Sequence, residues 1–159
     1  MRHRLGLVIF CVCTVGTLAT LGRFAYAAES QKDTYPIDTC IVSGEKLGGS
    51  MGSPVVITYK GREIRFCCPA CKPKFEANPD EYLKKLDAAI IEKQGPTYPL
   101  DHCVVLGTKF DEKTKPVDYI YKNRLVRFCC KDCIAQFEKD PQKYLKIIDD
   151  AAAAKSKKG

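Results

Sequence analysis

Two stretches of the chain alternate between apolar and polar positions in the way that antiparallel strands do. In the first stretch the apolar residues fall on every second position: Val55, Ile57 and Tyr59, then Ile64 and Phe66. Lys60-Gly61 lies between the two runs, so the pattern predicts a β-hairpin with a two-residue turn. A later stretch predicts a second hairpin, in which Lys122-Asn123 forms the turn because asparagine tolerates the left-handed backbone.

A helix is predicted after each hairpin. Asn78-Pro79-Asp80-Glu81 has an N-cap residue, a proline at the first helical position and a glutamate that completes a capping box, and Asp140-Pro141 repeats the cap and the proline. Apolar residues then recur at helical spacing and are expected in the core: Tyr82, Leu83, Leu86 and Ile90, and later Tyr144, Leu145 and Ile148. Gln94-Gly95-Pro96 is expected to end the first helix.

The two hairpin–helix units are copies of one module. Tyr35-Pro36-Ile37-Asp38-Thr39-Cys40 returns as Tyr98-Pro99-Leu100-Asp101-His102-Cys103, and Arg65-Phe66-Cys67-Cys68 returns as Arg127-Phe128-Cys129-Cys130. We therefore predict an α+β protein with modules at residues 33–93 and 96–152 and a basic flexible tail at 153–159. A module of ~60 residues buries a small core, so each is expected to need a metal or a cross-link, and the short link allows the copies to pack together.

The first 27 residues have the three parts of a secretory signal peptide. Arg2, His3 and Arg4 form a basic start, the run from Leu5 to Leu21 is mostly apolar, and Ala25-Tyr26-Ala27 is a small-x-small cleavage pattern. We predict cleavage after Ala27, which also removes Cys11 and Cys13, and a secreted or periplasmic protein that meets the membrane only during export. A retained anchor is disfavoured because glycine and threonine dilute the apolar run.

Composition and charge argue against several functions. The chain has 159 residues and a net charge of +7, but much of the basic excess lies in the signal segment and the tail, and no basic stripe with interleaved aromatics supports nucleic-acid binding. His102 is the one histidine after the signal segment, and no nucleophile motif accompanies it. We therefore expect a non-catalytic protein.

The cysteines after the signal segment carry the candidate chemistry. Each copy has one early cysteine and, after the predicted hairpin, a Cys-Cys-x-x-Cys sequence; the candidate metal ligands are Cys40, Cys67, Cys68 and Cys71, and Cys103, Cys129, Cys130 and Cys133. The hairpin folds the chain back, which would bring the early cysteine to the later ones. Thiolates suit Zn(II) and Cu(I), about one ion per module. Thiols at a helix start are expected to have a lowered pKa.

The spacing also resembles a known family. Phe66-Cys67-x-x-x-Cys71-x-x-x-Phe75-x-x-x-Pro79-x-x-Tyr82-Leu83 and its counterpart from Phe128 to Leu145 are similar to the TRASH/YHS heavy-metal-binding domains, over about residues 35–91 and 98–150. The resemblance implies small treble-clef or zinc-ribbon-like modules that act in sensing, trafficking or resistance to soft metals. It also implies a ligand set in each copy: Cys40, Cys67 and Cys71, and Cys103, Cys129 and Cys133.

The fourth ligand of each site stays open at this point. Cys68 and Cys130 stand where relatives often have serine, so either thiol, water or another group could complete a site. Ser43 could also contribute in the first copy, whereas Leu106, its counterpart, cannot bind metal. His102 is a second-rank candidate, because neighbouring residues rarely face the same ion and an exposed loop histidine is the simpler interpretation.

Two other functions compete with metal binding. A secreted chain with an even number of cysteines is typical of disulfide-stapled interaction modules. Cys68-Pro69-Ala70-Cys71 is a motif of thiol–disulfide redox proteins, although no βαβ pattern surrounds it. We favour binding of Zn(II) or Cu(I) for trafficking, storage, resistance or as a structural clip, with another periplasmic or membrane protein as a candidate partner.

Overall fold

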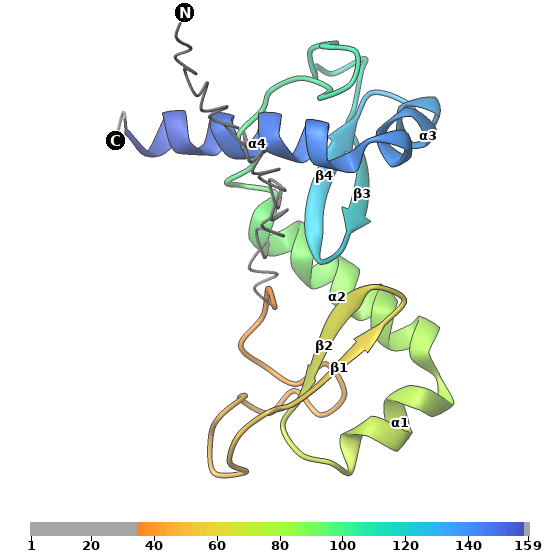
Figure 1. Ribbon diagram of the computed structural model, residues 1–159, viewed down its shortest axis with the longest axis vertical. Coiled ribbons are helices and arrows are strands. Elements are labelled where there is room, and N and C mark those ends of the chain that lie inside the picture. Colours follow the sequence, from red (N-terminus) through yellow and green to blue (C-terminus); the bar gives the residue numbers. More distant parts are fainter. Residues whose placement is uncertain (1–34, 158–159) are drawn as a thin grey trace, which may run out of the picture. The chain divides into compact units, whose positions relative to one another are not determined.

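The computed structural model describes residues 35–157. The first copy contains strands β1 (Val55–Tyr59) and β2 (Arg62–Phe66), followed by helices α1 (Cys71–Ala77) and α2 (Pro79–Gln94) (Figure 1). The second copy repeats this order with β3 (Val117–Tyr121), β4 (Arg124–Phe128), α3 (Asp132–Lys139) and α4 (Pro141–Ser156). Each strand pair is antiparallel, which confirms the predicted α+β class and the two hairpin–helix modules. The predicted signal peptide lies outside the described residues.

Both hairpins close with the expected two-residue turns. Tyr59 pairs with Arg62 across the first turn, and Tyr121 pairs with Arg124 across the second. The backbone is left-handed at both turn positions in each copy, with φ of 48° and 73° at residues 60–61 and of 47° and 63° at residues 122–123. Such turns match the twist of the strands, and glycine or asparagine at the second position lowers their cost.

The two long helices begin at the expected residues but are capped differently. Asp140 caps α4 as predicted, since its carboxylate accepts a hydrogen bond from the Lys143 N–H at 3.3 Å. The predicted capping box at Asn78 is wrong in its geometry: the Asn78 side chain donates to the Glu81 carboxylate at 2.8 Å and accepts nothing from the helix backbone. The Glu81 carboxylate accepts from the amide group of Asn78, and this bond draws the side chain away from the helix backbone. An aspartate such as Asp140 has no amide donor and can only accept.

One phenylalanine in each short helix anchors the module core. Phe75 of α1 is fully buried, and its ring lies 5.2 Å from the Tyr59 ring and 5.6 Å from the Phe66 ring between centroids. Phe137 of α3 lies in the same way against Tyr121 and Phe128, at 5.2 Å and 5.5 Å. The predicted core positions Leu86, Ile90, Tyr144, Leu145 and Ile148 are buried, and Tyr82 and Leu83 are partly buried. These aromatic contacts hold each hairpin against the helix that follows it.

The two copies share one hydrophobic core. Helix α2 follows the first hairpin in the chain but contacts β3 and β4 of the second. Gln94, its last residue, accepts a hydrogen bond from the Leu125 N–H at 2.8 Å and donates one to the Asn123 carbonyl oxygen at 3.1 Å. The copies therefore pack on one another, as the short link allows, and each module adds apolar contacts to the core of the other.

The ends of the described region differ from the sequence expectation in one respect. Helix α4 continues to Ser156, through the residues expected to begin the basic tail. Ala151–Ala154 are strong helix formers, and Lys155 reaches the Tyr98 carbonyl oxygen at 3.5 Å. Within residues 35–157 we found no helix long and apolar enough to span a membrane.

Candidate metal centre

The early cysteine of each copy begins a tight turn that sequence analysis did not identify. The Cys40 N–H donates to the Glu45 carbonyl at 2.7 Å, and the Gly44 N–H donates back to the Cys40 carbonyl at 2.8 Å. Cys103 makes the same pair of bonds with Thr108 and Gly107, each at 2.8 Å. Both glycines have positive φ, 78° and 70°. The signal was present in the sequence, since a glycine follows each early cysteine at the same spacing in both copies.

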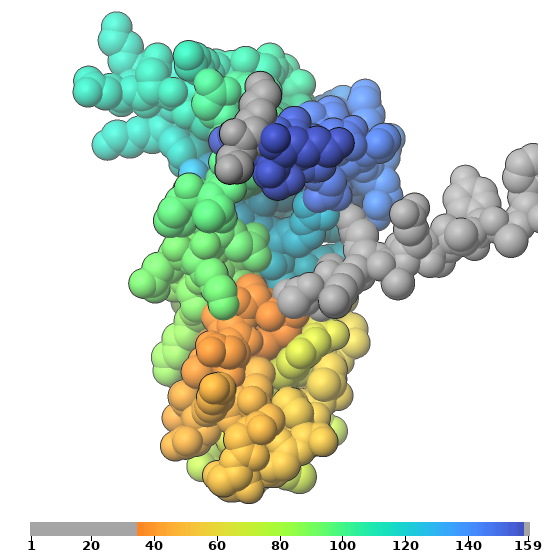
Figure 2. All heavy atoms as spheres, turned by 90° about the vertical axis from the view of Figure 1, so that its left-hand side faces the viewer, coloured from red at the N-terminus to blue at the C-terminus, as the bar shows by residue number. Residues whose placement is uncertain are grey.

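The other cysteines come from the junction between hairpin and helix. Cys67 directly follows β2, and Cys71 is the first residue of α1. Figure 2 shows the segment from residue 35 onward (orange) packed against the first hairpin (yellow) as a continuous body, which carries Cys40 to this junction. The fold thus brings together residues that are far apart in the chain, as the hairpin pattern predicted.

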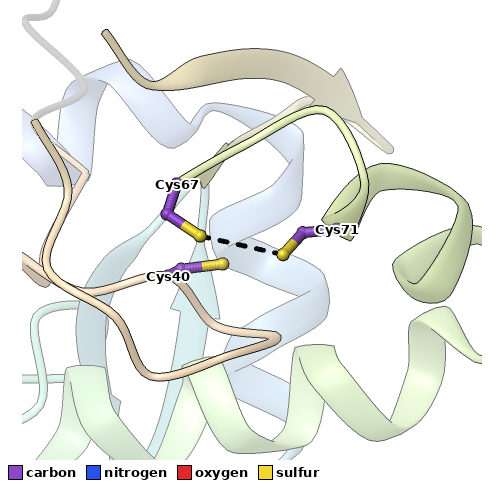
Figure 3. Close-up of side chains that lie close together, drawn as sticks. All are labelled: Cys40, Cys67 and Cys71. Atoms are coloured by element: carbon purple, nitrogen blue, oxygen red, sulfur yellow. Dashed lines mark hydrogen bonds between the residues drawn. The ribbon is translucent and has the colours of Figure 1, made fainter. Parts of the chain in front are cut away.

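Three sulfur atoms of each copy converge on one point. The Sγ atoms of Cys40, Cys67 and Cys71 all lie within 4.8 Å of one another and point toward a common centre (Figure 3). All three residues are at most 5% exposed. The second copy gathers its corresponding cysteines, Cys103, Cys129 and Cys133, within the same limit. We refer to these two sets as the first and second thiol triads.

The spacing of the triads suits a thiolate-bound ion. The Cys67 and Cys71 sulfur atoms are 3.8 Å apart, and those of Cys129 and Cys133 are 3.7 Å apart. Two sulfur ligands at the usual Zn–S distance of about 2.3 Å in a tetrahedral site stand about 3.8 Å from each other. All eight cysteines of residues 35–157 are free thiols. Each triad could therefore hold a metal ion with little movement of its side chains.

The fourth cysteine of each copy lies beside its triad, in contact with the cysteine at the short helix. Cys68 Sγ lies 3.8 Å from Cys71 Sγ, and Cys130 Sγ lies 3.4 Å from Cys133 Sγ. Neither belongs to the set of sulfur atoms that are all mutually close. Both side chains are half-buried, so they stand at the outer edge of the triad.

The thiols of the first copy differ widely in acidity. Burial raises the pKa of Cys40, but hydrogen bonds from the Ser43 side chain and nearby backbone groups outweigh it and lower this pKa to about 7. Burial raises the pKa of Cys71 to about 12, together with the hydrogen bonds that its protonated form makes with the Cys67 and Cys68 thiols. Lowering at a helix start is therefore a wrong expectation for Cys71, because desolvation and neighbouring sulfur outweigh the helix N–H groups.

The second copy repeats this division. Burial opposes ionisation of Cys103, yet backbone N–H groups near Leu106 and Cys129 lower its pKa. Burial raises the pKa of Cys133, as do hydrogen bonds with the Cys130 and Cys129 thiols. The helix-start expectation is therefore wrong for Cys133 as well. In each copy the early cysteine therefore ionises more readily than the cysteine at the start of the short helix, which keeps its proton.

The remaining candidates take different places. The Ser43 hydroxyl lies 3.2 Å from Cys67 Sγ, so it contacts the first triad as a hydrogen-bonding group. Its counterpart Leu106 is 65% exposed. His102 pairs with the Asp101 carboxylate, Nδ1 to Oδ1 at 2.8 Å, and lies outside the second triad. The exposed-loop interpretation of His102 thus fits its position.

Comparison with known proteins supports the family resemblance. The YHS domain family model matches residues 52–85. This segment contains the first hairpin, Cys67, Cys68 and Cys71, and it agrees with the resemblance drawn from the motif. Neither the curated proteins nor the solved structures gave a match to this chain. YHS domains are of the TRASH metal-binding type, so the match over residues 52–85 and the geometry of the triads indicate the same chemistry.

Proposed function

We propose that this protein binds a soft heavy-metal ion, Cu(I) or Zn(II), in each of its two modules and has no catalytic activity. The observation that carries the proposal is the duplicated triad: the chain builds the same three-thiol arrangement twice, from the same three structural positions. Duplication of a cluster of three reactive thiols, five of the six buried, is difficult to explain by packing alone, because other small apolar residues would fill the same space without reactive groups.

The donor atoms favour a soft ion over a hard one. Each triad offers sulfur atoms only, and among residues 35–157 no carboxylate or imidazole joins either set. Calcium and magnesium require oxygen ligands, whereas thiolates select Zn(II) and Cu(I). Three thiolates suit three-coordinate Cu(I), and a tetrahedral Zn(II) would need a fourth ligand from outside the triad.

The protein's own residues prepare the site before an ion arrives. The turn at Cys40 fixes one sulfur atom, and the end of β2 and the start of α1 fix the other two, so binding orders few additional bonds. Burial of all three thiols of the first triad limits competition by water for the ion there. Because the pKa of Cys71 is raised to about 12, binding must displace its proton, and the free cluster is neutral at this position near pH 7.

The signal-peptide pattern supports a role outside the cytoplasm. We place the mature protein in a secreted or periplasmic compartment, where it would store, carry or detoxify the ion, or use it as a structural clip. A periplasmic or membrane protein that receives or supplies the ion is the partner that this role requires. The alternatives are the disulfide-stapled module and the thiol–disulfide redox protein, and the following experiment separates metal binding from both.

Metal content of the protein, measured together with its number of free thiols, tests the proposal. The mature chain, purified anaerobically and offered Cu(I) or Zn(II), should hold about two ions, one for each thiol triad. Cys71→Ser and Cys133→Ser should each lose about one ion, and the double variant nearly all. His102→Ala is the matched control and should retain both, because this side chain pairs with Asp101. The intact triad in each single variant reports whether the rest of the chain is still folded.

The contrary outcomes are distinct. A chain with almost no metal and no titratable thiols would be a disulfide-stapled module. A chain with free thiols that still binds neither ion would refute the proposal without supporting the disulfide alternative. Loss of thermal stability on metal removal would assign the ion a structural role, whereas unchanged stability would assign it the role of cargo.

A further inference from the structure

The fourth cysteine of each copy divides the thiols into two overlapping sets. The buried triad holds Cys40, Cys67 and Cys71, and an outer pair consists of Cys68 and Cys71 at 3.8 Å. Cys71 belongs to both sets. The second copy has the same overlap, with Cys130 and Cys133 at 3.4 Å as its outer pair. A thiol that stands beside the triad, outside the set of mutually close sulfur atoms, is poorly placed to strengthen binding of the ion but well placed to receive it.

We propose that Cys68 and Cys130 are exchange ligands, through which the ion passes between the buried triad and a thiol-bearing acceptor. This inference rests on the proposed metal-binding function. In the first copy, a bond from the ion to Cys68 forms while the bond to Cys40 or Cys67 breaks, and the Cys68 proton passes to the released thiolate. The ion keeps its charge throughout, so the step needs no oxidant or reductant. Thiols of the acceptor then replace the remaining cysteine ligands one at a time, Cys68 last, and each incoming thiol passes its proton to the thiolate that it releases.

The second copy shows the route by which an acceptor would approach. A cavity of about 400 Å³ opens beside the second triad, and its wall includes Val105, Leu106, Asp132 and Gln136. Cys130 and Cys133 line it as well, whereas Cys103 and Cys129 do not. A donor atom entering this cavity therefore meets Cys130 and Cys133 before the other two thiols of the module. Cys130 is the half-buried thiol of this pair, and Cys133 is the buried one.

Stepwise exchange has a kinetic consequence that separates it from simple coordination. A fourth holding ligand strengthens the equilibrium affinity, and its removal weakens binding. An exchange ligand lowers the barrier to transfer in both directions, so its removal slows uptake and release together and leaves the affinity nearly unchanged. Both thiols can be replaced by serine, which keeps the size of the side chain but is a far poorer ligand for a soft ion.

The test measures affinity and transfer rate in the same variants. The mature chain, Cys68→Ser, Cys130→Ser and the double variant are loaded with Cu(I) or with Zn(II), and metal content and Kd are determined by chelator competition. Stopped-flow transfer to glutathione, and separately to a non-thiol chelator, then gives the rates. We expect metal content to be unchanged, Kd to stay within about threefold, and transfer to glutathione to fall by about tenfold or more in the double variant. In each single variant, about half of the bound ions, those held by the substituted module, should be released slowly.

Every other result has a defined meaning. A Kd weakened by about tenfold with metal lost in proportion would make Cys68 and Cys130 holding ligands and overturn the proposal. Unchanged rates in the double variant would make them bystanders. If the double variant slows transfer to the non-thiol chelator but not to glutathione, transfer to a thiol-bearing acceptor is wrong. If the unsubstituted chain binds neither ion, the proposed function has failed, and that failure is visible before any rate is measured.

Discussion

The turn of the second hairpin offers a quantitative test of how the two copies support each other. Asn123 is the one buried polar residue among the described positions, at 2% exposure. Its Oδ1 accepts a hydrogen bond from Arg62 Nε at 3.0 Å, and its Nδ2 donates to the Glu63 carbonyl oxygen at 2.7 Å. Both partners belong to the first hairpin. Asn123→Gly keeps the left-handed backbone, where φ is 63°, and removes both bonds.

The expected loss follows from those two bonds. A neutral hydrogen bond contributes about 1 kcal/mol to the free energy of unfolding, and one with a charged donor contributes about 2 kcal/mol. Arg62 keeps its ion pair with Asp87 at 2.6 Å, so its charge is not left unpaired. We therefore expect Asn123→Gly to destabilise the chain by about 3 kcal/mol. Asn123→Ala should cost about 1 kcal/mol more, because alanine resists the left-handed conformation.

Urea unfolding of the reduced, metal-free mature chain, followed by circular dichroism, measures both losses. Gly61→Ala is the matched control, because Gly61 holds the same turn position in the first copy, with φ of 73° and nothing within 4 Å of an added Cβ. It should lose only the backbone contribution, about 1 kcal/mol. If Asn123→Gly stays within about 0.5 kcal/mol of the unsubstituted chain, the contact between the hairpins does not stabilise the protein and the reasoning is wrong.

Three further changes have expected outcomes. Gly95→Ala should lower the urea midpoint, because its Cβ would lie 2.5 Å from the Ile91 carbonyl oxygen; an unchanged midpoint would show that the end of the helix adjusts freely. Metal affinity should strengthen with pH by at least about one log unit per pH unit between roughly pH 6 and 9, since the ion must displace a proton from Cys71, whose pKa is raised to about 12. A flat profile in chelator competition would remove Cys71 from the ligands. Ser43→Ala should raise the pKa of Cys40 above its value of about 7, so that the ultraviolet absorbance of its thiolate develops at a higher pH in a titration. An unshifted titration curve would contradict the hydrogen-bond explanation.

The features that could be predicted are those set by local pattern. The two-residue turns follow from alternation interrupted by Lys60-Gly61 or Lys122-Asn123, and the helix starts follow from the prolines at 79 and 141. The convergence of the triads was also predictable, because a hairpin of known length returns the chain to its starting side. Each of these inferences needs only residues that are close in sequence, or one chain reversal.

The features that could not be predicted depend on competition between groups. The Asn78 side chain has two possible partners, and the sequence does not decide between a backbone N–H and the Glu81 carboxylate. The pKa of Cys71 depends on how deeply the thiol is buried and on sulfur atoms from distant positions, which overcome the helix-start effect that the sequence indicated. The contact of Asn123 with the first hairpin could not be predicted either, because its place in the turn already explains an asparagine at this position.

A comparison of the two copies within this chain separates what the chemistry requires from what the packing requires. All four cysteines occur in both copies, and so do the glycines at 44 and 107 that shape the turn after the early cysteine. The second turn position differs, with Gly61 in one hairpin and Asn123 in the other, and the difference lies where only one of the two turns is buried against its neighbour. Because a left-handed turn accepts either residue, the asparagine adds a contact between the copies at little cost in backbone strain. The two modules have therefore diverged in how they pack and not in how they arrange sulfur, which is what a protein that presents two equivalent thiol sites requires.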